Sequence, residues 1–193
     1  MKRPCAILLS GAPGTGKSTL AAALAPRLGA AVLDIDVATG PLTDVVSRLI
    51  GVTDLSDRRL AELTRVPRYD TLLALAGDNL RAGVPVVLVA PFTAERSVRG
   101  WTALADRLAG RAAGLVLVWL HLPPDHLVDR LKQRAAARDT DKVTNPAAFL
   151  ATVDHGPPAV PHLALDATTP VGDLVDRVVA HLTRAGLAID GKP

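Results

Sequence analysis

The chain has 193 residues, of which 49% are hydrophobic and 3% are aromatic. This length suits one domain with a sizeable core, and the apolar fraction argues against general disorder. The formal net charge is only +3, and the arginines are mostly scattered rather than clustered as in nucleic-acid binders. The composition therefore argues against a nucleic-acid partner. The mild positive charge suits small anionic ligands.

Cysteine usage and hydropathy exclude several further classes. Cys5 is the single cysteine, so it cannot form a disulfide within the chain, and no His/Cys spacing typical of a zinc site is present. No segment resembles a signal peptide, and no apolar run reaches the roughly 18 residues of a membrane span. We therefore expect a cytoplasmic protein without membrane contact, either a monomer or a homodimer.

The first half of the chain alternates short apolar runs with helical periodicity. In chain order we expect strand Ala6–Ser10, helix Ser18–Leu28, strand Ala31–Ile35, helix Pro41–Ile50, helix Ser56–Leu63 and helix Arg68–Ala82. The helix at Pro41–Ile50 would carry Leu42, Val45, Val46 and Leu49 on one face.

The second half continues the alternation. In chain order we expect strand Val84–Ala90, helix Ala94–Ala109, strand Gly114–Leu122, helix Pro124–Arg138, a short helix at Pro146–Val153, strand His162–Asp166 and helix Val171–Arg184. The whole pattern predicts one α/β domain over residues 1–193, a three-layer α/β/α fold with a five-stranded parallel sheet. The proline-rich stretch Asp139–Pro161 has a poorer pattern, and we expect a lid over approximately residues 132–150.

A phosphate-binding motif joins the first strand to the first helix. Residues 11–18, Gly-Ala-Pro-Gly-Thr-Gly-Lys-Ser, match G-x-x-x-x-G-K-[ST] at every position and in the required strand–helix context. Its glycines let backbone amides surround phosphates, and the helix N-terminus adds partial positive charge. The motif predicts that Mg²⁺ binds Ser18, and that the nucleotide ATP binds Gly11, Ala12, Pro13, Gly14, Thr15, Gly16, Lys17, Ser18 and Thr19.

Two carboxylates follow the second strand. Asp34 and Asp36 are two residues apart, so on a strand they would face the same side, at the sheet edge where ligands bind. One could hold Mg²⁺ and the other could orient and deprotonate a substrate hydroxyl. Asp36 is the favoured base because it lies further along the chain toward the crevice, and Asp34 the favoured metal-side acid. One of the pair could instead cap the next turn.

The third strand has no acid at its end. It finishes in Val89-Ala90-Pro91-Phe92-Thr93, and the first carboxylate after it is Glu95. Motor-type ATPases place acids there to hold magnesium and activate water. Their absence favours phosphoryl transfer to a bound substrate over hydrolysis, and Arg68 and Thr93 are further candidates for contacting that substrate.

Three arginines recur every fourth residue after the fourth strand: Arg130, Arg134 and Arg138. Residues at this spacing share one helix face. A helix end of this kind before a mobile segment could swing guanidinium groups over the transferred phosphate. We predict nucleotide contacts for all three and a catalytic role for Arg134, beside Lys17 and Asp36.

The phosphate loop, the Asp34-x-Asp36 pair and Arg130-x-x-x-Arg134 together resemble the P-loop kinases of small molecules, such as shikimate kinase, gluconate kinase and chloramphenicol phosphotransferase. The segments from Arg68 to Phe92 and from Arg138 to Lys142 are similar to kinase-type AAA-family ATPases of bacteria. The resemblance implies the nucleoside-monophosphate-kinase-like fold with strand order 2-3-1-4-5. It also implies that Asp36 is the base, Asp34 the magnesium-side acid, Arg134 a lid arginine and Arg130 the arginine beside the adenine.

Departures from the resemblance limit the choice of substrate. The third strand ends in Ala90-Pro91 where shikimate kinase has a Gly-Gly anion site, which argues against shikimate. No arginine closely follows Asp36, which weakens a polynucleotide-kinase or zeta-toxin interpretation. The prediction is an ATP-dependent kinase of a small-molecule hydroxyl. The alternatives are a kinase of RNA, a nucleotide sugar or a toxin-type target, an NTP-hydrolysing switch protein, and a protein that only binds nucleotide.

Overall fold

A computed structural model describes residues 4–52, 57–110, 112, 114–134 and 143–187. Its centre is one five-stranded, all-parallel sheet with the order β2-β3-β1-β4-β5. The strands are β1 (Cys5–Ser10), β2 (Ala31–Asp34), β3 (Val86–Val89), β4 (Gly114–His121) and β5 (Leu163–Asp166). This architecture confirms the predicted α/β fold and the strand order that the resemblance implied.

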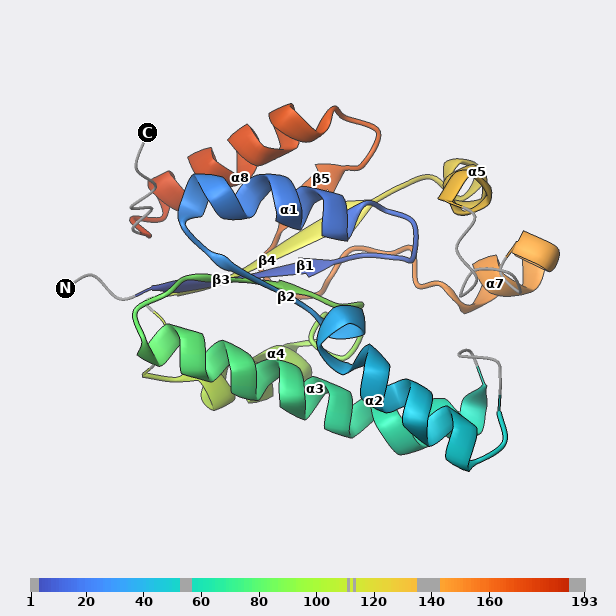
Figure 1. The fold of residues 1–193 in the computed structure, drawn as a ribbon. Helices are drawn as coiled ribbons and strands as arrows, with labels where there is room; N and C mark the ends of the chain where they lie inside the picture. Colours follow the sequence, from blue (N-terminus) through green and yellow to red (C-terminus); the bar gives the residue numbers. More distant parts are fainter. Residues whose placement is uncertain (1–3, 53–56, 111, 113, 135–142, 188–193) are drawn as a thin grey trace.

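Helices cover both faces of the sheet (Figure 1). Helices α1 (Lys17–Leu28) and α8 (Val171–Arg184) lie on one face. The other face is covered by α3 (Arg58–Arg81) and α4 (Val98–Leu108), with α2 (Ile35–Leu49) packed on the outer end of α3. Helices α5 (Pro124–Arg134) and α7 (Pro146–Thr152) lie beyond the carboxyl ends of the strands.

The central strand β1 separates two apolar clusters because its side chains alternate between the sheet faces. Ile7 and Leu9 pack on the α1 and α8 side. Ala6 and Leu8 pack on the α3 and α4 side. All four are fully buried, as expected for a parallel strand covered on both faces.

Helices α2 and α3 depart most from the boundaries that we expected, and α4 begins at Val98, four residues after its predicted start at Ala94. Helix α2 begins directly after β2, six residues before Pro41, because the Asp34 carboxylate accepts the amide proton of Asp36 at 2.9 Å and caps the new helix. Helix α3 is continuous through Pro67, where the sequence indicated a break. Burial of Leu60 before the proline and of Leu72 after it offsets the hydrogen bond that Pro67 cannot donate.

The orientation of α2 also differs from a simple amphipathic helix. The side chains that it buries are Ile35, Thr39, Thr43 and Ser47. Three members of the predicted apolar face, Leu42, Val45 and Leu49, are instead exposed to water, and the fourth, Val46, is half-buried. None of the described helices is both long and apolar enough to cross a membrane.

Candidate active site

The phosphate loop wraps tightly between β1 and α1. Gly11 has φ +148°, and a β-carbon there would lie 2.4 Å from the Leu120 carbonyl oxygen. Gly14 has φ +89°, and a β-carbon there would press on Leu131 of α5 at 3.1 Å. Only glycine fits the backbone at Gly11 and Gly14, which explains why the motif has glycine at these two positions.

Lys17 is the first residue of α1, at the helix end where partial positive charge gathers. Its ammonium group donates to the carbonyl oxygens of Gly11 and Ala12, each at 2.8 Å. The cation is therefore held against the loop whose amides would surround a phosphate chain. This arrangement can bind the β- and γ-phosphates of a nucleotide.

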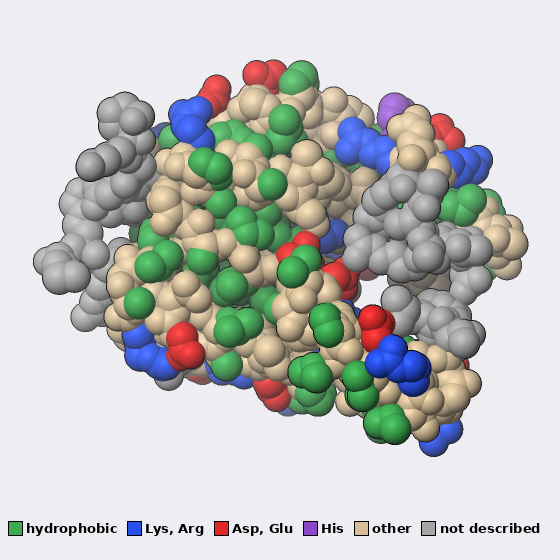
Figure 2. Space-filling model, viewed as in Figure 1, with side chains coloured by type: hydrophobic (Ala, Val, Ile, Leu, Met, Phe, Trp, Pro, Cys, Tyr) green, Lys and Arg blue, Asp and Glu red, His purple; other side chains and the backbone are tan. Residues whose placement is uncertain are grey.

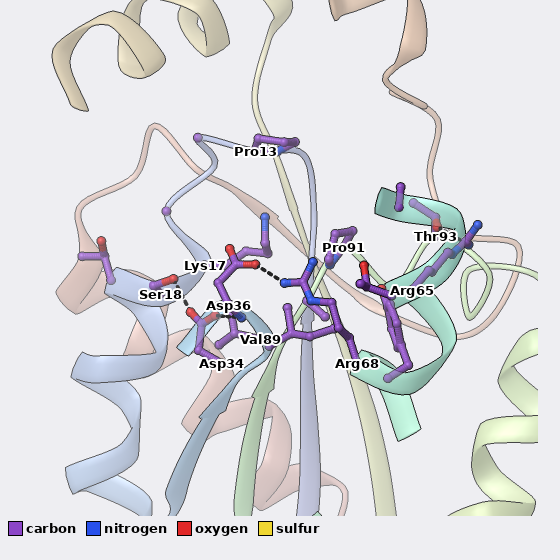
Figure 3. Close-up of a pocket in the computed structure, with 18 of the residues that line it drawn as sticks. Pro13, Lys17, Ser18, Asp34, Asp36, Arg65, Arg68, Val89, Pro91 and Thr93 are labelled. Atoms are coloured by element: carbon purple, nitrogen blue, oxygen red, sulfur yellow. Dashed lines mark hydrogen bonds and ion pairs between the residues drawn. The ribbon is translucent and has the colours of Figure 1, made fainter. Parts of the chain in front are cut away.

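Ser18 and Asp34 lie together beside the loop. The Ser18 hydroxyl donates to the Asp34 carboxylate at 2.7 Å (Figure 3). Hydroxyl and carboxylate oxygens are the ligands that Mg²⁺ prefers, so the pair fits a magnesium ion bridged to nucleotide phosphates. Among the described residues there is no cluster of three His, Cys, Asp or Glu side chains, so phosphates and water would have to complete the coordination.

Asp36 stands on the first turn of α2, not on the strand as its spacing from Asp34 suggested. Its carboxylate accepts a hydrogen bond from the Arg68 guanidinium at 2.6 Å, and Arg68 also donates to the Thr39 hydroxyl at 2.8 Å. The strand argument for the acidic pair was therefore wrong in its geometry. Both carboxylates nevertheless line the same pocket.

The wall opposite the phosphate loop comes from α3 and the segment after β3. The Arg65 guanidinium lies 3.4 Å from the Thr93 hydroxyl, with both side chains at the pocket (Figure 3). Behind them the Tyr69 hydroxyl accepts the amide proton of Phe92 at 3.1 Å. Phe92 has φ +47°, the one positive φ outside glycine in the described chain, so Tyr69 holds a strained backbone in place.

A buried carboxylate lies next to this wall. Glu95 has one oxygen, Oε2, that is shielded from solvent and has no hydrogen-bond partner among the described residues. Burial raises the pKa of Glu95, opposed by the positive charges of Arg65 and Arg107. Glu95 is not among the residues that line the pocket.

The arginine helix is described only in part. The Arg130 guanidinium donates to the Ala167 carbonyl at 2.6 Å, in the segment after β5, and lines the pocket. Arg134 ends α5, but its side chain lies outside the described part, as does the whole of Arg138. Most of the predicted lid, from 135 to 142, also lies outside the described residues.

A single pocket of about 860 Å³ joins these groups at the carboxyl edge of the sheet. Its lining includes Gly14, Gly16, Lys17, Ser18, Thr19, Asp34, Asp36, Arg65, Arg68, Thr93 and Arg130. The sequence did not identify Ala61, Thr64 or Gln133, which line it too and are chemically ordinary. Ala61 and Thr64 belong to the part of α3 before Pro67. No local signal in the sequence indicates that the helix continues through this proline.

Known proteins with similar sequences fall into two kinds. Residues 7–154 match the family model AAA_33, described as an AAA domain. The large subunit of replication factor C from Methanococcus maripaludis strain C7 is 33% identical over 92 residues, but the chain spans only 19% of that protein's length. A shikimate kinase from Saccharopolyspora erythraea is 30% identical, over 69% of this chain and 95% of the relative.

Solved structures agree on the fold. A gluconokinase from Sinorhizobium meliloti 1021 superposes with a TM-score of 0.60 at 22% identity, covering 96% of this chain and 95% of that one. The match spans nearly the full length of both chains, unlike the match to replication factor C. The family model covers more than half of the sequence, so the chain belongs to this AAA domain family, and its fold is the α/β fold of P-loop kinases.

Proposed function

We propose that the protein transfers the γ-phosphoryl group of ATP to a hydroxyl group of a small-molecule acceptor. The observation that carries the proposal is the continuity of the pocket. It runs without a partition from the phosphate loop to the wall of Arg65, Arg68 and Thr93, with Asp36 between them. Its volume leaves room for an acceptor beside a triphosphate.

Each of these groups has a role in in-line phosphoryl transfer. Lys17 and the loop amides hold the phosphates, and Asp36 accepts the hydroxyl proton as the acceptor oxygen bonds to the γ-phosphorus and the bond to ADP breaks. Ser18 and Asp34 would hold Mg²⁺, which neutralises phosphate charge when bound. Arg130, which lines the pocket, would contact the nucleotide, and we assign Arg134 and Arg138 to the phosphates on the basis of their helical spacing alone.

Arg68 would act on the acceptor side. Its ion pair with Asp36 holds the carboxylate in place at the pocket, beside the acceptor. Thr93 and Arg65, 3.4 Å apart, offer a hydroxyl and a cation to the same acceptor. Kinase relatives with different acceptors favour this reaction class, and sugar acids, aminocyclitols and hydroxylated antibiotics all remain compatible acceptors.

Hydrolysis by a switch protein finds less support. At the end of β3 the pocket is lined by Val89, Ala90 and Pro91, none of which can activate water. The strongest candidate base, Asp36, faces the acceptor wall instead. We therefore expect slow hydrolysis without an acceptor.

The test is a transfer assay with γ-labelled ATP and a panel of sugar acids, aminocyclitols and hydroxylated antibiotics. Asp36→Asn should lower transfer by about 10²- to 10⁴-fold because it removes the proton acceptor, while nucleotide affinity changes little. Asp106→Asn is the matched control, since Asp106 is an exposed acid on α4 outside the pocket. Full transfer by Asp36→Asn would remove Asp36 from the mechanism, and no transfer to any member would contradict this acceptor class.

A further inference from the structure

Helix α2 buries its hydroxyl groups and exposes its hydrocarbon. Thr39 and Thr43 are 3% and 8% exposed, and their hydroxyls donate to the carbonyls of Ile35 and Thr39 one turn earlier. Ser47 is also buried and donates to the Val52 carbonyl. The inner face is therefore satisfied by backbone hydrogen bonds and needs no further partner.

The outer face carries Leu42, Val45 and Leu49, which are 70%, 42% and 80% exposed. We call these three residues the α2 stripe. Their spacing of three and four residues places them on one line along the helix. In a monomer such a line would face the core, so an apolar stripe facing water indicates a surface that another molecule covers.

The surrounding surface is apolar as well. In the part of the chain that the structure describes, seven of the ten large exposed hydrophobic side chains lie between residues 32 and 66. They include Val32 on β2, which is one of the two edge strands of the sheet. Figure 2 shows hydrophobic side chains over β2 and along α2 on this one face. Most of the exposed large hydrophobic side chains thus belong to β2, α2 and the first half of α3, three elements that contact one another.

We propose that this face is the contact surface of a symmetric homodimer, in which the α2 stripes of two copies pack against each other in antiparallel orientation. With the two-fold axis beside Val45, Leu42 of one copy meets Leu49 of the other. Isologous contacts of this kind need only one self-complementary patch, which the stripe supplies.

The charges on α2 select both the orientation and the occupant. Asp44 and Arg48 are exposed one turn apart beside the stripe. In an antiparallel pair the same flank of each helix lies on the same side of the contact, which brings Asp44 of one copy toward Arg48 of the other, twice. A parallel two-fold pair puts these flanks on opposite sides, so neither charged pair would form. Helix α2 has no lysine and two acids against one arginine, so an anionic membrane surface is a poor partner for it.

The exposed hydrocarbon is of the same order as the area that such a contact needs. The seven side chains leave on the order of 400 Å² of apolar surface in water. A standard interface of about 800 Å² per partner, somewhat over half of it apolar, needs roughly 500 Å² of such surface. The large side chains therefore supply most of that area before any backbone or alanine is counted.

The first test measures molar mass by sedimentation or light scattering up to about 100 μM chain, where a micromolar dimer is fully formed. The wild-type protein should show the mass of two chains. Val45→Glu should shift it to one chain, because two buried carboxylates would meet at the axis. The matched control is Val171→Glu on α8, whose valine is 40% exposed against 42% for Val45 and should stay dimeric.

A second test reports the geometry and does not depend on a destabilising charge. Val45→Cys should form a disulfide between two copies under mild oxidation because position 45 lies beside the axis, while Val171→Cys should not. The natural Cys5 is buried and should not contribute. A wild-type mass of one chain at every concentration, or equal cross-linking at positions 45 and 171, would overturn the proposal.

Discussion

Tyr69 supports the pocket wall that Arg65, Arg68 and Thr93 form. Its hydroxyl accepts the Phe92 amide proton and its ring meets the Phe92 ring edge-to-face at 5.9 Å. A second hydroxyl, that of Ser10, donates to the Pro91 carbonyl at 2.8 Å. Two hydroxyls from other elements thus fix the strained turn that presents Thr93 to the pocket.

The protonation of Tyr69 should be measurable by itself, because it is the only tyrosine in the chain. Burial raises the pKa of Tyr69 to about 12, and the negative charge of Glu95 adds to the effect. The unfolded chain should titrate near its usual pKa of about 10. At a pH of about 11 the native protein should therefore show little tyrosinate absorbance, and the urea-unfolded protein should show much more.

The free energy of unfolding should depend on pH because of the same raised pKa of Tyr69. Because the pKa of Tyr69 is raised on folding, its contribution to stability is complete below about pH 10 and is lost as the pH rises toward about 12. The free energy of unfolding should fall over this window by an amount on the order of 2 kcal/mol. Tyr69→Phe should lack this part of the decline, and an identical decline in both proteins would contradict the assignment.

At the scale of elements, Arg96 ties together two connections that are far apart in sequence. It is 8% exposed, and it donates to the carbonyl of Asp154 at 3.0 Å and to that of Gly156. Its guanidinium lies 5.8 Å from the centre of the Trp119 ring. Its own carbonyl accepts the Ala159 amide proton at 2.8 Å, so the segment before β5 is anchored to the segment after β3.

Removing this anchor should be costly. Arg96→Met should lower the free energy of unfolding by about 2–4 kcal/mol, because the carbonyls of Asp154 and Gly156 lose a charged donor. Arg99→Met is the matched control, since Arg99 is exposed three residues later and should change stability by less than about 0.5 kcal/mol. Urea unfolding measures both, and equal effects would show that Arg96 is not an anchor.

The elements that sequence patterns predicted well are those whose signals are local. Val171–Arg184 was predicted at both ends, and each strand was found within two residues of its expected limits. The start of α2 and the continuity of α3 were missed, whereas the end of α2 was found within one residue of its prediction. Gly40-Pro41 and Pro67 both read locally as breaks, but an Asp34 cap and the burial of Leu60 and Leu72 outweigh them.

For the site, too, the features that lie close together in the sequence were the ones that could be predicted. The phosphate loop could be predicted because its chemistry lies in eight consecutive residues. The Asp36–Arg68 pair and the Tyr69–Phe92 contact join residues 32 and 23 positions apart, so only the fold brings them together. The exposure of the α2 stripe depends on which face meets α3, and periodicity alone cannot decide that.

At the scale of the whole molecule, the pocket is assembled where five segments meet at one edge of the sheet. The β1–α1 loop, the β2–α2 junction, α3, the β3–α4 segment and α5 all contribute to its lining. A ligand that spans these segments should tighten them against one another. Binding to the folded state alone stabilises a protein by mass action, so thermal unfolding can report it.

ATP with magnesium at about 100 times its dissociation constant should raise the unfolding temperature by roughly 5–10 °C, since about 2.7 kcal/mol is gained and a domain of this size shifts about 2–4 °C per kcal/mol. Ser18→Ala should lose the part of the rise that a metal chelator also abolishes, because the Ser18 hydroxyl next to Asp34 is the assigned ligand. Asp34→Asn should also lose the magnesium-dependent part of the rise. It should not weaken the N-terminal cap of α2, because asparagine also caps helices well. If Ser18→Ala kept the whole magnesium-dependent rise, the ion would have to bind elsewhere in the pocket.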